Sequence, residues 1–313
     1  MSQINDFSQI LPTDPLPLLF NKAPVHIQYR SIKYFDPENK KVLGALQKKR
    51  KNNKRRNRLF KTQREDGSWA LDTNYKIEKK KNAMLFLKQL QNLTELLYQG
   101  ENSRSETIKN ALIRLIKFQK EDGKFPLAHH HQGYALWLLA QYGLAGNPIV
   151  EKGYRWLIKR QKKDGGWISP LMKLSEDVSG DVTSCLWTSI IITQAFSAHS
   201  RLKNSDTTKK AANFIAERYL YKNHTSLFPE ADAWDYLHTD HTENGMFRGG
   251  TLRFCEALTP LDYMHDNKNF QKAIKWLKSL QLDNGLFPAK ANNPNKGDYH
   301  VTFRVLKVLD QIQ

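Results

Sequence analysis

The chain has 313 residues, and its 40% of hydrophobic and 11% of aromatic residues supply one large core or two ordinary ones. No run approaches the ~20 apolar residues of a membrane span, and two cysteines, Cys185 and Cys255, are too few for a disulfide scaffold. The formal net charge of +18 favours phosphates, anionic lipid headgroups or other negatively charged partners.

The sequence begins without the basic and apolar segments of a secretion signal, so we expect a cytoplasmic protein. Residues 1–24 contain four of the twelve prolines and no helical period, which predicts an irregular N-terminal arm. We expect residues 25–313 to form a single domain. A short helix is predicted over 24–35 and should end near Asp36, because a residue before proline avoids helical geometry.

A basic helix is predicted over roughly 38–63, and its 48–58 segment carries much of the positive charge. Such a segment is either a solvated helix face or a point of peripheral contact with an anionic membrane. No aromatic residue is interleaved with these charges before Phe60. The segment therefore gives no specific nucleic-acid signal.

One sequence motif, which predicts a helix followed by a glycine turn and an aromatic residue, occurs four times. It is complete over 152–167 and returns with variations in 59–69, 115–125 and 272–287. Self-similarity of this kind is typical of a repeat architecture. The glycine follows Asp or Asn in each copy, which favours a helix that ends in left-handed geometry. We expect the glutamine before the turn to bond backbone groups of the next hairpin, and the aromatic residue to fill the seam.

A second, less charged helix follows each turn. The one predicted over 181–196 is apolar on nearly every side and should be buried, whereas the helix before it is apolar along one side only. One helix of each pair is therefore expected to face inward and the other outward. A degenerate unit, with helices over about 206–221 and 251–258, brings the total to five hairpins, and 24–35 is a candidate extra inner helix.

In these repeats the chain resembles the squalene-cyclase and protein-prenyltransferase superfamily. The family motif runs Lys/Arg, Gly/Ala, two positions, aromatic, aliphatic, three positions, Gln, three positions, Gly, one position, Trp. Residues 152–167 match it throughout, and 272–287 match with Phe287 at the last position. The other two units carry Arg58 and Arg114 where the family has an aromatic residue. The resemblance implies an all-α fold, an α/α toroid in which inner helices surround a central cavity and outer helices form the rim.

Three predicted inner helices open on a titratable residue, namely His131, Asp181 and His300. Each follows a turn of the repeat, so a closed ring would bring the three to one mouth of the cavity. Helix capping is the alternative reason for an aspartate at such a place. We expect His129 and His130 to be loop residues, with His131 alone facing inward, because consecutive side chains on a helix point apart.

The segment around Asp181 resembles the acidic motif of terpene cyclases that start a reaction by protonation. The resemblance implies that Asp181 is the acid, and Asp177, four residues earlier, would share the proton. For that role burial would have to raise the pKa of Asp181. The chain departs from the family in two ways. It lacks the DxDD tetrad, and it has material for one barrel where full-length cyclases use two.

Protein prenyltransferase catalytic subunits are single barrels that hold zinc with Asp, Cys two positions later, and His. The segment before His300 resembles their histidine segment, and Asp181 falls on their aspartate, but Thr183 occupies the cysteine position. Cys185, one helical turn after Asp181, would be the substitute, which gives Asp181, Cys185 and His300 as a conceivable zinc site. Otherwise we expect no cofactor. A magnesium site needs clustered carboxylates, and the inner helices show no DDxxD pattern.

We therefore predict a terpene (isoprenoid) cyclase, an isomerase-like enzyme of isoprenoid biosynthesis with an isoprenoid-like substrate. The alternatives are a prenyltransferase-like partner subunit without catalysis and a polysaccharide-active toroid enzyme. Aromatic faces stabilise carbocations as they stabilise other cations, although at helical spacing they are also ordinary core residues. The residues predicted to line or cover the cavity, with Arg248 as a candidate to hold a phosphate or carboxylate, are Tyr134, Trp137, Trp187, Trp234, Tyr236, Arg248 and Phe254.

Overall fold

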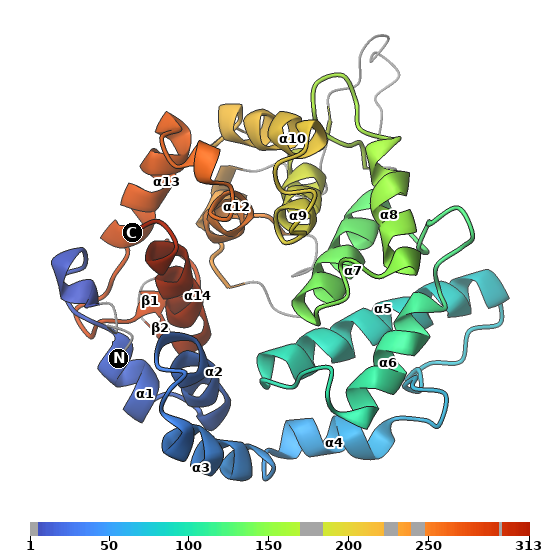
Figure 1. The fold of residues 1–313 in the computed structure, drawn as a ribbon, viewed down its shortest axis with the longest axis horizontal. Helices are drawn as coiled ribbons and strands as arrows, with labels where there is room; N and C mark the ends of the chain where they lie inside the picture. Colours follow the sequence, from blue (N-terminus) through green and yellow to red (C-terminus); the bar gives the residue numbers. More distant parts are fainter. Residues whose placement is uncertain (1–5, 170–183, 222–230, 239–247, 294–295) are drawn as a thin grey trace.

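The computed structural model describes residues 6–169, 184–221, 231–238, 248–293 and 296–313. Nearly all of the regular structure in these ranges is helical (Figure 1). The exceptions are two short strands, β1 (Phe287–Pro288) and β2 (Gly297–Asp298), which pair antiparallel. The prediction of an all-α fold is confirmed.

Two sets of helices alternate along the chain. The inner set is α2 (Val25–Phe35), α5 (Glu78–Tyr98), α7 (His129–Gln141), α9 (Leu186–Ser197), α12 (Thr251–Leu258) and α14 (Tyr299–Asp310). The outer set is α1 (Leu16–Asn21), α3 (Lys40–Arg50), α4 (Lys54–Thr62), α6 (Glu106–Ile116), α8 (Pro148–Ile158), α10 (Asp206–Glu217) and α13 (Lys268–Ser279). Three short 3-10 turns are η1 (Phe7–Gln9), η2 (Ala231–Asp235) and η3 (Asp262–Met264).

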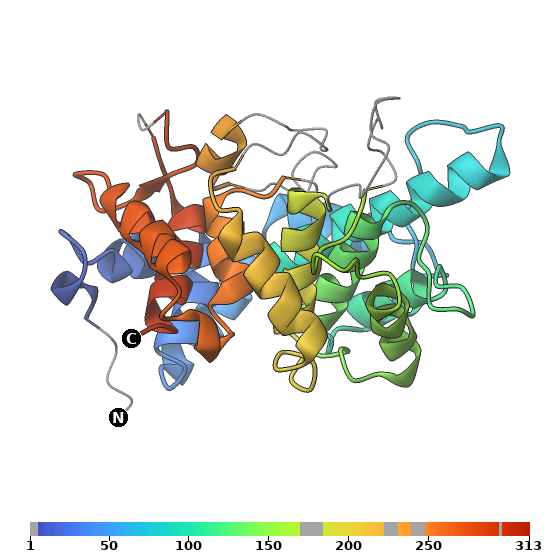
Figure 2. The same ribbon diagram turned by 90° about the horizontal axis from the view of Figure 1, so that it is seen from above.

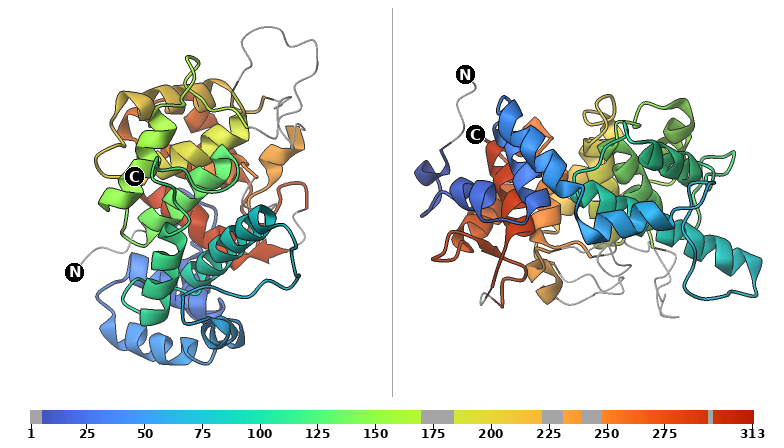
Figure 3. Two further views of the ribbon diagram at one scale, coloured as in Figure 1. Left: turned by 90° about the vertical axis from the view of Figure 1, so that its right-hand side faces the viewer. Right: turned by 90° about the horizontal axis from the view of Figure 1, so that it is seen from below.

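The inner helices follow one another around a ring. Helix α5 contacts α7, α7 contacts α9, α9 contacts α12, α12 contacts α14, and α14 contacts α2. Helices α2, α5, α7, α9 and α12 also pack against an outer partner, as α7 does with α8 and α9 with α10 (Figure 1). Figures 2 and 3 show that the amino-terminal part of α5 projects beyond the ring. The inner position of 24–35 agrees with the sequence prediction.

The predicted basic helix over 38–63 is wrong, because the structure has two helices there. Helix α3 ends at Arg50 and α4 begins at Lys54. The Asn53 side chain accepts a hydrogen bond from the Arg56 amide, which satisfies a free donor of the first turn of α4. An asparagine side chain bonds nearby backbone groups in this way more readily than it continues a helix. The continuous run of basic residues gave no sign of this helix boundary.

The glycine turns adopt the predicted left-handed geometry. Gly123, for example, has φ +95°, and a Cβ there would lie 2.2 Å from the carbonyl oxygen of Lys152 at the next outer helix. The aromatic residue of the turn fills the seam: Trp69 and Trp167 are buried, and their Nε1 groups donate to the carbonyls of Leu59 and Leu157 at 2.8 and 2.9 Å. These motif residues hold one hairpin against the next.

The motif glutamines also bridge neighbouring hairpins. Gln161 Nε2 donates to the carbonyl of its own Gly165 and to that of Thr207 in α10, at 2.7 and 2.8 Å. Gln281 makes the same contact with the N-terminal segment, donating to the Thr13 carbonyl at 2.7 Å and accepting from the Thr13 amide at 3.1 Å. The start of the chain therefore takes the place of the next outer helix after the last repeat.

The prediction of an irregular arm over 1–24 is consequently wrong for 16–21, which form α1. Apolar side chains of this segment are buried in the same core as α12 and α14; they are Phe7, Leu11, Leu16 and Leu19. Prolines at the start of α1 do not break it, because proline suits the first turn of a helix. The arm is part of the ring.

Ion pairs join helices α3 and α4 to the end of α5 and to the loop that follows it. Arg50 and Arg56 both bind the Glu101 carboxylate, at 2.9 and 2.7 Å, and Arg50 also donates to the Gln99 carbonyl. Arg55 lies 3.0 Å from Glu95. Part of the 48–58 segment is thus engaged in structural ion pairs.

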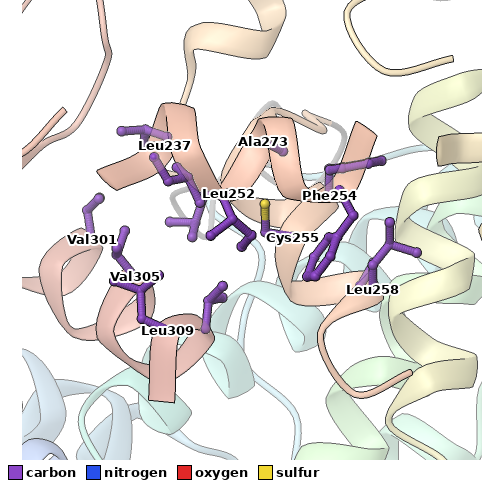
Figure 4. Close-up of a cluster of buried hydrophobic side chains, with 14 of the residues drawn as sticks. Leu237, Leu252, Phe254, Cys255, Leu258, Ala273, Val301, Val305 and Leu309 are labelled. Carbon is purple, nitrogen blue, oxygen red and sulfur yellow. The ribbon is translucent and has the colours of Figure 1, made fainter. Parts of the chain in front are cut away.

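Two large apolar clusters fill the space between the rings. One joins α9, α10, α12, α13 and α14 to the arm, and the other joins α5 to α8 with α9. Figure 4 shows the first, where Leu252 of α12 lies on the side nearer Val301 and Val305 of α14. Both cysteines are buried. Among the described residues, no helix combines the length and apolar character that crossing a membrane requires.

Candidate functional site

The inner helices enclose a cavity of about 360 Å³. It lies toward their carboxyl ends, because it is bordered by Gln141 at the end of α7, Ser197 at the end of α9 and Thr259 just after α12. His131 and His300, two of the predicted titratable residues, stand at the opposite, amino-terminal ends of α7 and α14. The cavity therefore does not include His131 or His300 in its lining.

Charged side chains dominate the cavity wall. Arg30 of α2, Arg253 of α12, and Arg304 and Lys307 of α14 all line it, against one carboxylate, Glu256. Four cations against one anion leave an excess of three positive charges in the described lining. An excess of this kind in a confined space attracts anions.

Glu256 is held by two neighbours. Arg304 Nε and Nη2 donate to its two carboxylate oxygens, each at 2.7 Å, and Gln194 Nε2 donates at 3.1 Å. Burial alone would raise the pKa of Glu256, but the charge and hydrogen bonds of Arg304, with the charge of Arg253, hold that pKa below its usual value. Arg304 and Glu256 therefore form a firmly ionised pair that neutralises one cation.

The positive charges of Arg30 and Lys307 are not neutralised by an ion pair of this kind within the described residues. Burial lowers the pKa of Arg30 to about 10, and the Arg30 guanidinium lies 4.6 Å from the centre of the Phe303 ring. The pKa of Lys307 is lowered by burial and then by the charge of Arg30. The Lys307 ammonium lies 4.8 Å from the centre of the Tyr34 ring and makes no hydrogen bond or ion pair within the described residues. Lys307 is thus a cation without a direct anionic partner.

Aromatic rings form a smaller part of the wall. Tyr98, Trp137 and Phe303 line the cavity, and Trp137 is the member predicted from sequence. Tyr134 lies behind it, 5.2 Å from Trp137 between ring centres, with its hydroxyl 3.1 Å from that of Thr94. Burial raises the pKa of Tyr134, which stays a neutral core phenol.

The prediction that Trp187, Trp234 and Phe254 line the cavity is not supported by their positions. Trp187 and Trp234 pack edge to face at 4.8 Å, and Phe254 stacks on Tyr219 at 5.0 Å, all within the hydrophobic core. The rings contact one another and Tyr219, which lies just after the outer helix α10. Helical spacing alone does not separate the core side of an inner helix from its cavity side.

Two predicted residues of the long loop pair with each other instead of lining the cavity. The Arg248 guanidinium lies 4.1 Å from the centre of the Tyr236 ring. Tyr236 also forms an isolated β-bridge with Lys290, whose ammonium lies 4.4 Å from the same ring. The tyrosine is therefore held between two cations, as aromatic faces commonly are.

The prediction that His129 and His130 lie in a loop is wrong, because α7 begins at His129. His131 is buried, at 3% exposed, but it is not the only one, because His130 is 5% exposed and its ring lies 4.2 Å from that of His131. Burial lowers the pKa of His130 to about 3 and that of His131 well below its usual value. His131 Nδ1 accepts from the amide of Ala128, the N-cap residue of α7, so this contact belongs to the helix end.

The amino end of α14 brings together several polar side chains. His300 Nδ1 lies 3.1 Å from Arg30 Nη1, and its ring lies 4.3 Å from that of Tyr98. Asp298 caps the helix through Oδ1, at 2.7 Å from the His300 amide, and contacts His238 Nδ1 through Oδ2 at 3.1 Å. Burial lowers the pKa of His300 well below its usual value.

Asp181 and Asp177 lie outside the described residues, so the predicted acid is not part of this geometry. Asp181 is also a member of the predicted zinc site, so that site is not fully described either. Of its other members, Cys185 caps α9 within the hydrophobic core, and His300 bonds Arg30. In the part of the chain that the structure describes, no three His, Cys, Asp or Glu side chains are arranged to hold a metal ion.

Sequence reasoning missed most of the cavity's charged residues, namely Arg30, Glu256, Arg304 and Lys307, and also the pair His238 and Asp298. A signal was present: charged residues interrupt otherwise apolar inner helices in Leu252–Leu258 and Val301–Leu309. Charged groups are almost never buried unless they are paired, so they identify the cavity side of such helices.

No family model matches the sequence, and no curated protein matches it. Among solved structures, the chain is similar to a protein from Actinoplanes, with 13% identity, 82% of this chain and 97% of that chain covered, and a TM-score of 0.32. It is also similar to the type II terpene cyclase MstE from Scytonema, with 12% identity, coverage of 81% and 94%, and a TM-score of 0.27. The chain is similar as well to a variant of that cyclase in complex with geranylgeranyl dihydroxybenzoate. The identity is 12%, the match covers 81% of this chain and 93% of that chain, and the TM-score is 0.26. At these TM-scores the similarity carries no argument about chemistry.

Proposed function

We propose that the ring of inner helices binds a small isoprenoid-like molecule that carries a carboxylate or phosphate group. One observation carries the proposal: the cavity lining holds four cationic side chains and a single carboxylate. Buried charges are costly unless they are paired, and an anionic ligand would supply the missing partner.

Lys307 is the cation best placed to bind such a ligand. It borders the cavity, and no hydrogen bond or ion pair engages its ammonium within the described residues. Arg304 is already committed to Glu256, and Arg253 donates to the carbonyl of Arg248. A phosphate or carboxylate oxygen would therefore meet Lys307 first, with Arg30 beside it.

The aromatic wall explains why the ligand would be more than an inorganic anion. Tyr98, Trp137 and Phe303 give the cavity an apolar side, and its volume of about 360 Å³ is within the range of small-molecule sites. An acidic headgroup on an apolar chain matches both features. An isoprenoid acid or diphosphate has this composition.

For the chemistry, we infer a terpene cyclase-like isomerase with Asp181 as the general acid. The support is the sequence resemblance at Asp181, together with Asp177 as a second carboxyl group. Comparing products of the wild-type chain and an Asp181→Asn variant with polyprenyl substrates tests the inference. A cyclic product that is lost in the variant supports it, and a variant as active as the wild type contradicts the assigned role.

The second candidate is binding without catalysis, as in a prenyltransferase-like partner subunit. The polarity of the cavity favours it, because hydrocarbon cyclisation needs an apolar, water-excluding surface and the lining instead holds five charged residues. Tight binding of a prenylated acid that is recovered unchanged supports this candidate. A third, action on acidic polysaccharides, shares the requirement for a basic cavity.

Calorimetric titrations distinguish the proposed ligand class from the alternatives. The four compounds are geranylgeranyl diphosphate, geranylgeraniol, inorganic diphosphate and an acidic disaccharide. We expect the prenyl diphosphate to bind more tightly than inorganic diphosphate, since it alone uses both the cations and the aromatic wall. Geranylgeraniol should bind weakly because it leaves the cations unpaired. Equal binding of the neutral alcohol and the diphosphate would contradict the proposal, and a preference for the disaccharide would replace the ligand class.

We also propose that the protein is cytoplasmic and touches membranes peripherally through 48–58, where isoprenoids dissolve. Arg50, Arg55 and Arg56 are engaged in ion pairs, but Lys48 and Lys49 are exposed. Binding to anionic vesicles should fall as the salt concentration rises, because salt screens exposed charges. Vesicle binding that does not change with salt would contradict this contact.

A further inference from the structure

Two histidines lie next to each other at the amino end of α14, outside the lining of the central cavity. The ring centres of His238 and His300 are 5.7 Å apart, and the rings meet edge to face. Each is fixed by a charged side chain on the nitrogen nearer its backbone: Arg30 contacts His300 Nδ1 and Asp298 contacts His238 Nδ1, both at 3.1 Å. One partner is a cation and the other an anion, so the two imidazoles are in opposite hydrogen-bonding states.

The state of His300 follows from its partner. Arginine has only donors, so His300 Nδ1 must accept, which places the proton of the neutral ring on Nε2. Burial and then the charge of Arg30 lower the pKa of His300 well below its usual value, so the neutral form persists. His300 Nε2 is buried and makes no hydrogen bond within the described residues. It is a donor without an acceptor, which is costly unless a ligand supplies one.

His238 is in the reverse state. Asp298 also accepts from the amides of His300 and Val301, and these bonds, with His238, hold its pKa below the usual value although burial alone would raise it. An ionised carboxylate only accepts, so His238 donates from Nδ1 and presents a lone pair on Nε2 when it is neutral. The His238 side chain is 36% exposed, so a solute can reach it.

The backbone fixes both rings before any ligand arrives. The His238 amide donates to the Ala289 carbonyl at 2.8 Å, and the neighbouring Tyr236 forms a β-bridge with Lys290. His300 stands in the first turn of α14, and its ring packs at a tilt against that of Tyr98. A carboxylate that orients an imidazole from its Nδ1 side is the arrangement that general-base catalysis requires.

We propose that His238 is a general base, positioned by Asp298, and that His300 Nε2–H binds the oxygen atom of the group that is deprotonated. The substrate class is a molecule with a hydroxyl group, or with an acidic C–H next to a carbonyl oxygen. Arg30, by donating to the far nitrogen of His300, strengthens the Nε2–H donor, because hydrogen bonds in a chain polarise one another.

The proton transfer balances without a further reagent. His238 Nε2 takes the proton from the substrate and becomes an imidazolium, which the Asp298 carboxylate stabilises. The electron pair of the broken bond stays on the substrate as an alkoxide or enolate, whose oxygen accepts from His300. The imidazolium then returns the proton to the same or another atom of the substrate, so the net reaction is an exchange or an isomerisation.

The pair borders the proposed ligand site through shared residues. Arg30 and Tyr98 line the central cavity and also contact His300. The identity of the substrate therefore rests on the proposed function, because a ligand held by the cavity cations is the molecule that this pair would act on. The reactivity of His238 itself does not depend on that ligand.

The first test uses bromoacetate, a small anionic alkylating agent, at pH 8, with peptide mass spectrometry to follow each histidine. Wild-type His238 should react several-fold faster than His265, whose Nε2 contacts the Thr259 carbonyl at 2.8 Å. In Asp298→Asn the side-chain oxygen can still cap α14, but its amide nitrogen cannot accept from His238. The variant should therefore lose the rate advantage at His238 and keep the rate at His265. An unchanged rate at His238 would overturn the assignment of a positioned base.

The second test follows deuterium incorporation from heavy water into a prenylated keto acid, at the carbon next to its carbonyl, after calorimetry has measured its binding. We expect incorporation with the wild type and its loss in His238→Gln, while the affinity of the ligand stays within a few-fold. Equal incorporation in both would overturn the proposal. If no ligand binds but the reactivity of His238 depends on Asp298, the proposed function fails and the histidine pair stands. If a ligand binds and His238 reacts like His265, the pair fails and the binding site stands.

Discussion

Arg304 of α14 and Glu256 of α12 form a two-point ion pair across the inner wall of the ring, with both nitrogen to oxygen distances at 2.7 Å. The pair joins two consecutive inner helices and removes one positive charge from the cavity. Glu256 is the single carboxylate in the described lining, which also holds Arg30, Arg253 and Lys307. The stability of the ring and its proposed affinity for anions are therefore coupled through one glutamate.

Glu256→Gln should destabilise the protein by about 3–5 kcal/mol, because it removes one partner of a buried pair. Added phosphate should recover part of the loss, since an anion that binds only the folded state stabilises it. Urea unfolding with and without phosphate measures both effects. Glu217→Gln, which breaks the exposed contact with Arg218, is the control and should cost no more than about 1 kcal/mol. A phosphate effect equal in both variants would contradict the coupling.

Gly123→Ala should destabilise the chain far more than Gly143→Ala. Both glycines have positive φ, at +95° and +82°, so each alanine loses about 1–2 kcal/mol to backbone strain. Only Gly123 has a neighbour in the way, because its Cβ would lie 2.2 Å from the Lys152 carbonyl oxygen, whereas nothing lies within 4 Å at Gly143. Thermal unfolding of the two variants measures the difference. Similar losses would mean that the turn is not packed against the next hairpin.

Gln281→Leu should detach the N-terminal segment from the last repeat. The change removes two hydrogen bonds to Thr13, each worth about 1 kcal/mol, at the joint where the chain's first and last parts meet. Hydrogen exchange should become faster in α1 while α7 stays protected. Gln271→Leu, on the exposed side of α13, is the matched control. Exchange in α1 that equals the wild type would show that Gln281 does not hold the ring closed.

Acidification should destabilise the protein partly through His26. Burial, followed by the charges of Arg30, Arg50 and Arg55, lowers the pKa of His26 to about 4. Between the ordinary histidine pKa of about 6.5 and that value, the unfolded chain binds more protons than the folded one, so stability falls as the pH falls. At pH 5 the loss is about 2 kcal/mol by linkage.

The measurement is the free energy of unfolding at pH 7 and pH 5. His26→Gln should show a smaller fall than the wild type, because its side chain takes up no proton. His265→Gln, in the turn after α12, should keep the full fall. A pH dependence that is the same in all three proteins would contradict the role of His26.

Much of the helical frame could be predicted from the sequence, because its determinants are local. Gly123 and Gly165 adopt left-handed geometry, and Gln161 bonds backbone groups. The motif residues therefore mark where each outer helix ends and where it contacts the next hairpin. The boundaries of α12 and the end of α2 followed from apolar runs and from proline. The break between α3 and α4 was missed because a single asparagine cap outweighed a continuous basic pattern.

The site could not be predicted in the same way. The lining depends on which side of each inner helix faces the cavity, and the buried helices are apolar on several sides. Trp187 and Trp137 come from equivalent helices, yet one packs in the core and the other lines the cavity. The pairing of His238 with Asp298 joins residues 60 positions apart in the chain. No local pattern records such a contact.

The most direct test of the anion site is a calorimetric titration of geranylgeranyl diphosphate into Lys307→Gln and Lys275→Gln. The first removes a cavity cation that has no direct anionic partner among the residues that the structure describes, and the second removes an exposed lysine of α13, so both lose one positive charge. A charge-assisted hydrogen bond is worth about 1.5–3 kcal/mol, so Lys307→Gln should weaken binding about tenfold or more, whereas Lys275→Gln should bind like the wild type. Equal affinities of the two variants would contradict the account.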